Sequence, residues 1–282
     1  TESAGVLSIR SVYDVDGVDT APGGITTVSN PATDEYTDRP ARFLRIEKVV
    51  SQPDEDTREI RNSAFGVAGR RFGMREILGY APIEPDGSVL VKVPANVALA
   101  ISVLDANGRR LPDTLGARHS SWLQVMPGET LECNGCHATE ADPPIAHGRK
   151  GLTDSVNPGA PAAGGAFPGT NPLLATLDAA ETMAEVRGRA MCNGACEPSV
   201  DIAFDDYWQP DYDPTAPSET IDMCYNATPS NIKNDPANLN NTHQCVNTLL
   251  TPPPTPDACR THWTGLCRIT INYQQIIQPL WD

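Results

Sequence analysis

Basic residues, aromatic residues and long apolar runs are all scarce in this chain of 282 residues. Lys and Arg number 21 against 36 Asp and Glu, which leaves a formal net charge of −15. This balance argues against a nucleic-acid partner, because such binding depends mainly on Lys and Arg that neutralise phosphates. No apolar stretch approaches the roughly 18–20 residues of a membrane-spanning helix, so no transmembrane segment is expected within this chain.

Aromatic residues make up only 6% of the chain, yet 39% of its residues are hydrophobic. That hydrophobic fraction is too high for an intrinsically disordered chain, and the length is sufficient for a real core. The 26 prolines and 22 glycines indicate many turns and short strands, with few long helices.

Alternation of apolar residues with period two predicts short strands in the first half of the chain. These strands are expected over residues 5–12, 41–50, 89–93, 97–103 and 121–125. Asn107-Gly108 follows the fourth of them with a hairpin signal. Short strands separated by turns are typical of an antiparallel sandwich. The fold class is therefore predicted to be mainly β, with an antiparallel β-sandwich-like domain over residues 1–130.

The eight cysteines divide into a central pair and a group of six in the last third of the chain. Six cysteines in a Pro/Asn/Thr-rich segment predict disulfides, and disulfides need an oxidising compartment. Pairing between sequence neighbours is favoured, because short loops close at low entropic cost. The expected bonds are Cys192–Cys196, Cys224–Cys245 and Cys259–Cys267. A metal site is the alternative, although zinc ligands usually come in closely spaced pairs and this segment has a single CxxxC.

The central pair belongs to Cys133-Asn134-Gly135-Cys136-His137, which has the CxxCH spacing of covalent c-type haem attachment. Two thiols add to the two vinyl groups of haem, and the next residue brings an imidazole to the iron as an axial ligand. A redox CxxC before a chance histidine, or half of a zinc site, is the alternative reading. The flanking residues lack a βαβ pattern and a second CxxC, so haem c is the favoured cofactor and His137 the proximal iron ligand.

The second axial ligand decides between electron transfer and catalysis, because an open position admits a substrate. His147 is favoured slightly, since it lies ten residues past His137 in a Pro-rich loop, an extended reach of roughly 30 Å. His119 precedes Cys133 by fourteen residues and is the second candidate. The remaining candidates are His243, His262 and Met126.

A second metal hypothesis concerns three carboxylates around a glycine turn, Asp14, Asp16 and Asp19. They are similar to the start of a calcium loop, in which oxygens at positions 1, 3 and 5 face the ion. Counting from Asp14, position 12 is Ile25 rather than glutamate. Calcium is therefore a possible second cofactor, and an ordinary acidic turn is the alternative.

Several stretches resemble the haem-bearing middle region of hydrazine synthase alpha-subunit-like proteins, a broad group of bacterial multihaem cytochromes. The resemblance covers residues 70–150 and rests on YAPIEPDGS (80–88), VPAN (93–96), LDANGR (104–109) and MPGET (126–130) ahead of CNGCH. In hydrazine synthase a tyrosine four residues past the motif histidine binds the iron. This chain has Ala141 there, so the resemblance implies ordinary ligation by His137 instead.

The resemblance also implies a location in the periplasm or on the outer surface of a bacterium. The first residues have neither the basic start nor the apolar core of a signal peptide, so this location requires a targeting segment that was removed or lies upstream. In the family, a stretch like residues 271–281 leads into a further CxxCH domain. The chain is therefore expected to be a piece of a larger protein or complex, with neighbouring haem domains or redox proteins as partners.

Three regions are predicted along the chain. After the sandwich-like domain, residues 131–191 are expected to hold the haem loop, a Pro/Gly-rich wrap and one or two short helices that begin at Asn171-Pro172 and end near Met191. Residues 192–282 are expected to be irregular, disulfide-stapled and continuous with a further haem domain. Electron transfer is the predicted function; a haem enzyme acting on a small nitrogen or oxygen species, related to hydrazine synthase, is the alternative.

Overall fold

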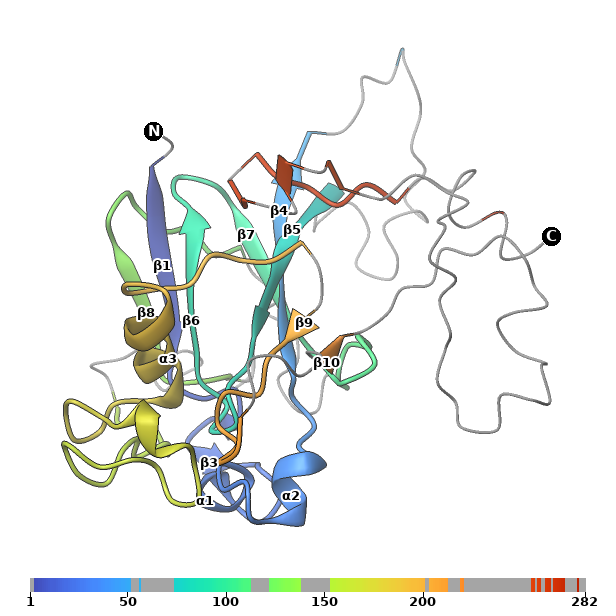
Figure 1. Cartoon of the computed structure of the whole chain (residues 1–282). Coiled ribbons are helices and arrows are strands. Elements are labelled where there is room, and N and C mark those ends of the chain that lie inside the picture. The colour runs from blue at the N-terminus through green and yellow to red at the C-terminus, as the bar shows by residue number, and fades with distance from the viewer. Residues whose placement is uncertain are drawn as a thin grey trace, which may run out of the picture.

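Two three-stranded sheets form the body of the protein (Figure 1). The computed structural model describes residues 3–51, 56, 74–112, 122–137, 153–200, 203–212, 219–220, 255–256, 258–259, 262–264, 266–271 and 278. The first sheet has the order β6-β1-β8 and contains β1 (Ala4–Ile9), β6 (Val89–Pro94) and β8 (Thr130–Cys133). The second has the order β5-β4-β7 and contains β4 (Phe43–Val50), β5 (Met74–Pro82) and β7 (Leu99–Leu104). β1 pairs in parallel with β8, and the other neighbours pair antiparallel.

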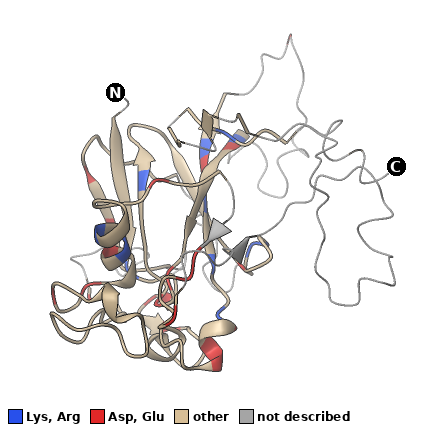
Figure 2. Cartoon of the chain, viewed as in Figure 1, with Lys and Arg blue, Asp and Glu red and all other residues tan. Residues whose placement is uncertain are grey.

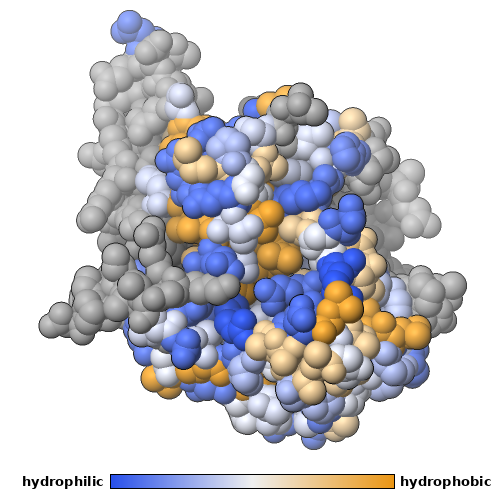
Figure 3. All heavy atoms as spheres, turned by 90° about the vertical axis from the view of Figure 1, so that its left-hand side faces the viewer, coloured by the Kyte–Doolittle hydropathy of each residue, from blue (hydrophilic) through white to orange (hydrophobic). Residues whose placement is uncertain are grey.

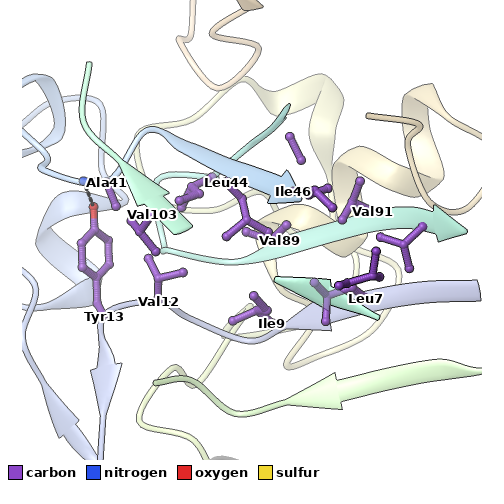
Figure 4. Close-up of a cluster of buried hydrophobic side chains, with 14 of the residues drawn as sticks. Leu7, Ile9, Val12, Tyr13, Ala41, Leu44, Ile46, Val89, Val91 and Val103 are labelled. Atoms are coloured by element: carbon purple, nitrogen blue, oxygen red, sulfur yellow. Dashed lines mark hydrogen bonds between the residues drawn. The ribbon is translucent and has the colours of Figure 1, made fainter. Parts of the chain in front are cut away.

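The main hydrophobic core combines side chains from both sheets (Figure 4). Alternation along β1 and β6 turns every second residue inward, so Leu7, Ile9 and Val91 join Leu44 and Ile46 of β4 in one buried cluster. Complete burial of such a side chain contributes about 1.5–3 kcal/mol. The predicted fold class, antiparallel β with few helices, is confirmed.

The predicted strands correspond to β1, β4, β6 and β7, whereas the other two strands of these sheets, β5 and β8, were not predicted. Residues 78–81 of β5 are all buried, so this strand lacks alternation. Its outer side is covered by a second cluster that includes Trp263, whose Nε1 donates to the Leu78 carbonyl at 3.0 Å. Within the described part of 121–125, the expected strand is reduced to one bridge between Leu123 and Leu99.

Short elements fill the stretch between β1 and β4, in which no strand or helix was predicted. A hairpin joins β2 (Asp14–Val15) to β3 (Val18–Asp19), and two single-turn helices follow, α1 (Ile25–Val28) and α2 (Asp34–Thr37). The Thr33 side chain caps α2 by accepting from the backbone N–H of Tyr36. Helices of one turn are too short to show a hydrophobic period.

The Pro/Gly-rich segment after the CNGCH motif packs beside the first sheet and contains two short helices, where one or two were predicted (Figure 1). Asn171 caps η4 (Pro172–Leu174), a single 3₁₀ turn. Thr182 and Glu185 form a capping box at the start of α3 (Met183–Met191), which ends where the sequence predicts. The face that carries β8 and α3 is a mosaic of polar and apolar patches (Figure 3).

Two of the three predicted disulfides are confirmed, Cys192–Cys196 and Cys259–Cys267. Cys224 and Cys245 lie outside the described residues. The chain that follows the first disulfide covers two sheet edges. The N–H of Lys92 donates to the Cys196 carbonyl at 2.9 Å, and Tyr80 and Ser199 exchange two backbone hydrogen bonds of 2.7 Å. Covered edges cannot pair with another chain. Farther on, β9 (Ala203–Phe204) pairs with β10 (Glu219–Thr220).

Charged side chains form pairs across β4 and β5, where Figure 2 shows basic and acidic residues side by side. Glu47 pairs with Arg45 and Arg75, and Lys48 pairs with Glu76 at 2.8 Å. Partly exposed pairs of this kind contribute about 0–1 kcal/mol each. Among the described residues, no helix is long and apolar enough to cross a membrane.

Candidate functional site

The first cysteine of the CNGCH motif is held at the edge of the first sheet. Cys133 is the last residue of β8 and lies opposite Ile9 of β1. The pairing continues past the end of β8, because the N–H of Arg10 donates to the Cys133 carbonyl at 2.8 Å and that of Ser11 to the Asn134 carbonyl at 3.1 Å. The motif therefore leaves a sheet whose backbone is fixed.

The second cysteine is held by the β2–β3 hairpin. The N–H of Cys136 donates to the Asp14 carbonyl at 2.7 Å, and the N–H of Asp16 donates to the Cys136 carbonyl at 3.0 Å. Both backbone polar groups of Cys136 are thus bonded to one hairpin. His137 follows at once and is half-buried. The structure therefore brings Cys133, Cys136 and His137 together in one loop that is anchored at each cysteine.

Gly135 is required by the close approach of the motif to the hairpin. A methyl group at this position would overlap the Asp14 carbonyl oxygen and would lie 2.6 Å from Asp14 Cβ and 2.7 Å from the Ser11 carbonyl oxygen. Real Cβ atoms do not approach other atoms this closely, and the atoms met here belong to the backbone or to a Cβ. Any larger residue at position 135 must push the motif away from the hairpin.

We expect Gly135→Ala to lower the free energy of unfolding by about 1–3 kcal/mol, the usual cost of inserting a methyl group into a packed site. Denaturant unfolding of the purified chain measures this change. Gly165→Ala is the matched control, since its added methyl group would lie 3.8 Å from the nearest atom, the Ala162 carbonyl oxygen. Equal stability of the two variants would contradict the prediction.

The two cysteines carry thiols that no disulfide joins. The Cys136 thiol lies 3.7 Å from the Val12 carbonyl oxygen, to which it donates. Burial raises the pKa of Cys136 to about 12, and the Asp14 carboxylate and the Cys133 thiol act in the same direction. Disulfide exchange needs a thiolate, which this buried environment disfavours. A thioether is uncharged, so the two sulfurs fit covalent attachment to the vinyl groups of a c-type haem, and the imidazole fits an axial ligand of its iron.

A short strap, residues 153–157, crosses the motif from the other side. Asn134 is buried, and its side-chain amide donates to the Thr153 carbonyl at 2.7 Å. The Ser155 hydroxyl lies 2.7 Å from Asp14 Oδ2 and 3.2 Å from the Asn134 carbonyl oxygen. The chain that leaves the motif at His137 therefore returns to it at Thr153.

The far end of the strap is tied to a buried polar network. The Asn157 side-chain amide donates to the Arg10 carbonyl at 2.8 Å and to Asp86 Oδ2 at 3.1 Å. Asp86 Oδ2 also accepts from the N–H of Met183, the first residue of α3. Burial raises the pKa of Asp86, and these hydrogen bonds, together with those from Ser88, lower it. The turn at Pro85-Asp86-Gly87 thus joins the strap to the start of α3.

Sequence reasoning singled out the three motif residues but not the strap or the buried carboxylates Glu84 and Asp86. Ser155 and Asn157 lie in a Pro/Gly-rich stretch without periodicity. Asp86 lies in a Pro-Asp-Gly sequence that indicates only a turn. Burial of both Glu84 and Asp86 within three residues depends on Arg187, Trp208 and α3, which come about a hundred residues later. No local signal contains that information.

The structure describes only some of the candidates for the second axial ligand. His119, His147 and His243 lie outside the described residues, as does Ala141. His262 is largely exposed, with Nδ1 3.8 Å from Glu197 Oε2. Met126 is also exposed. The identity of the second ligand therefore stays a prediction.

The three carboxylates of the calcium hypothesis have different surroundings. Asp14 is fully buried and accepts hydrogen bonds from Gly17, Ser155 and Val156. Asp19 accepts from the backbone N–H groups of Ala21 and Ile25. Asp16 is exposed, at a positive φ of 52°. In the part of the chain that the structure describes, no three His, Cys, Asp or Glu side chains converge as metal ligands. Calcium stays a prediction.

Comparison with known proteins gives two results. Residues 40–138, which include the whole CNGCH motif, match the family of the hydrazine synthase alpha subunit middle domain. A chain of Kuenenia stuttgartiensis hydrazine synthase matches at 22% identity over 48% of this chain and 18% of that chain, with a TM-score of 0.34. The matched region is thus less than a fifth of that relative's length. No curated protein matches.

Proposed function

Residues 40–138 resemble the middle domain of the hydrazine synthase alpha subunit, and from this premise we propose that the chain is a c-type cytochrome module that transfers electrons within a larger haem protein. Cys133 and Cys136 would hold the haem through thioether bonds, and His137 would be an axial ligand of the iron. The observation that carries the proposal is the CNGCH loop itself, with two thiols and an imidazole on a backbone anchored at each cysteine.

The anchoring supports electron transfer because it limits movement at the site. Haem supplies a one-electron iron couple, and its potential depends on axial ligands, hydrogen bonds and burial. In this chain β8 and the β2–β3 hairpin hold the backbone of the two cysteines. The strap adds hydrogen bonds to Asn134. A fixed ligand loop favours electron transfer, because little rearrangement is then needed between the two oxidation states.

The disulfides support a location outside the cytoplasm. Cys192–Cys196 and Cys259–Cys267 are both formed, and such bonds persist in oxidising compartments. The hydrazine synthase that matches part of this chain is bacterial. We therefore infer a periplasmic or outer-surface protein, whose partners are redox proteins or further haem domains.

A haem enzyme is the second candidate, and the match to a hydrazine synthase domain is the observation that favours it. Such an enzyme would act on a small nitrogen or oxygen species at an open axial position. Electron transfer is preferred because the family's tyrosine ligand position holds Ala141 in this chain, and His137 can then serve as an ordinary ligand.

Two measurements on the full chain, produced in a bacterial periplasm with c-type maturation, test these functions. We expect a pyridine haemochrome spectrum of one covalent haem per chain; its absence would overturn both candidates. We then expect a low-spin ferrous spectrum that carbon monoxide does not change. A high-spin ferrous form that binds carbon monoxide would contradict electron transfer and favour the enzyme.

A further inference from the structure

Asp14 lies at the centre of the contacts between the haem loop, the β2–β3 hairpin and the strap. Its side chain is 0% exposed, which is unusual for a carboxylate. One carboxylate oxygen accepts from the N–H of Gly17 at 3.0 Å and closes the hairpin turn. The other accepts from the Ser155 hydroxyl at 2.7 Å and from the N–H of Val156 at 2.9 Å.

The backbone of the same residue completes the arrangement. The Asp14 carbonyl accepts from the N–H of Cys136, the residue immediately before His137. The Ser155 hydroxyl that bonds Asp14 also contacts the carbonyl of Asn134, inside the CNGC sequence. One aspartate therefore fixes the second cysteine through its backbone and the strap over the loop through its side chain.

We propose that Asp14 is a positioning residue for the haem loop and the fixed negative charge beside it. This inference rests on the proposed function. It gives the Asp14–Asp19 turn a role that the sequence alone did not suggest. The carboxylate holds the loop in the shape that presents both sulfurs and the imidazole. Its charge favours the ferric over the ferrous state, because a nearby negative charge stabilises the more positive iron.

Asp14→Asn is the direct test, since asparagine keeps the shape but removes the charge. Its NH₂ group in the place of Oδ2 also opposes the N–H of Val156, so two donors face each other. We expect fewer haems per chain by pyridine haemochrome, and a midpoint potential shifted upward in spectroelectrochemical titration of the chains that carry haem.

Asp105→Asn is the matched control. Asp105 Oδ1 accepts from the N–H groups of Asn107 and Arg109, both at 2.8 Å, so its replacement also removes one charge and weakens an aspartate turn. The Asp105 turn follows β7 of the second sheet, whereas the motif follows β8 of the first sheet. We expect Asp105→Asn to retain native haem content and native potential, which separates the proposed role from a general loss of charge.

Ser155 separates position from charge and keeps the test decisive if Asp14→Asn does not fold. Ser155→Ala removes the hydroxyl between Asp14 and Asn134 but leaves the carboxylate, so haem content should fall without an upward shift of the potential. Ser155→Thr keeps the hydroxyl and should restore the haem content.

The outcomes distinguish this inference from the proposed function. A native chain without covalent haem would overturn both. Suppose instead that the native chain carries haem. Unchanged haem content and potential in Asp14→Asn, together with unchanged haem content in Ser155→Ala, would then overturn the role of Asp14 alone. Calcium that raises the melting temperature of the native chain but not of Asp14→Asn would make Asp14 a calcium ligand and would also overturn it.

Discussion

A chain in which Cys133 and Cys136 are both alanine is expected to carry no covalent haem. The thiols are the only groups in the motif that can form thioether bonds, and each lies on a backbone anchored by a different element. The residual chain can bind haem only without a covalent bond, and acidified acetone then extracts it. The measurement is the pyridine haemochrome spectrum of the protein pellet after this extraction, compared with the native chain.

The control for this prediction is a second pair of cysteines with similar spacing. Cys192→Ala/Cys196→Ala also removes two sulfurs, but these form a disulfide at a sequence separation of 4. Loss of so short a loop closure costs about 2 kcal/mol, so this variant should melt at a lower temperature and still retain its covalent haem. Covalent haem in the Cys133/Cys136 variant, or its loss in both variants to the same extent, would refute the assignment of the motif.

The disulfides and the strands show what short-range patterns can predict in this chain. Cys192–Cys196 and Cys259–Cys267 pair as expected because loop closure over 4 and 8 residues depends mainly on sequence separation. β6 was predictable because one face meets the core, which leaves a period-two pattern. β5 was not, because the Trp263 cluster covers its outer side and removes the alternation.

The candidate site also has one part that a short-range pattern predicts and another that depends on the fold. The CxxCH spacing predicts Cys133, Cys136 and His137 as the haem-attachment residues, because covalent haem attachment requires these groups within five consecutive residues. Asp14 precedes that motif by more than a hundred residues, and Ser155 follows it by about twenty, yet both support it. Their roles depend on which segments the fold brings together, and a single sequence does not contain that information.

The second large expected effect is a loss of stability when the buried ion pair of Glu84 and Arg187 is broken. Glu84 is 2% exposed and accepts from Arg187 Nη1 at 2.8 Å and from Trp208 Nε1 at 2.6 Å. The Arg187 guanidinium also lies 5.0 Å from the centre of the Tyr207 ring. These contacts fasten α3 and the Trp208 segment to the end of β5. Arg187→Met keeps much of the side-chain volume but leaves a buried carboxylate without its cation.

We expect Arg187→Met to lower the free energy of unfolding at neutral pH by about 3–5 kcal/mol, the usual cost of removing one partner of a buried ion pair. Denaturant unfolding followed by circular dichroism measures this loss. The double variant Glu84→Gln/Arg187→Met should recover most of the stability, because the glutamine carbonyl can still accept from Trp208 and position 84 no longer carries an unpaired buried charge. A double variant no more stable than Arg187→Met would contradict this account.

The pH dependence of the same variant follows from the pKa of Glu84. Burial raises this pKa, while the Arg187 charge and the hydrogen bonds from Trp208 and Arg187 lower it. Without Arg187 the pKa rises further in the folded state but is unchanged in the unfolded state. A raised carboxyl pKa favours folding at low pH and opposes it as the pH rises through that pKa. The difference in unfolding free energy between the native chain and Arg187→Met should therefore narrow as the pH falls. The difference between the native chain and the double variant should not narrow in this way, because the double variant has no carboxyl group at position 84.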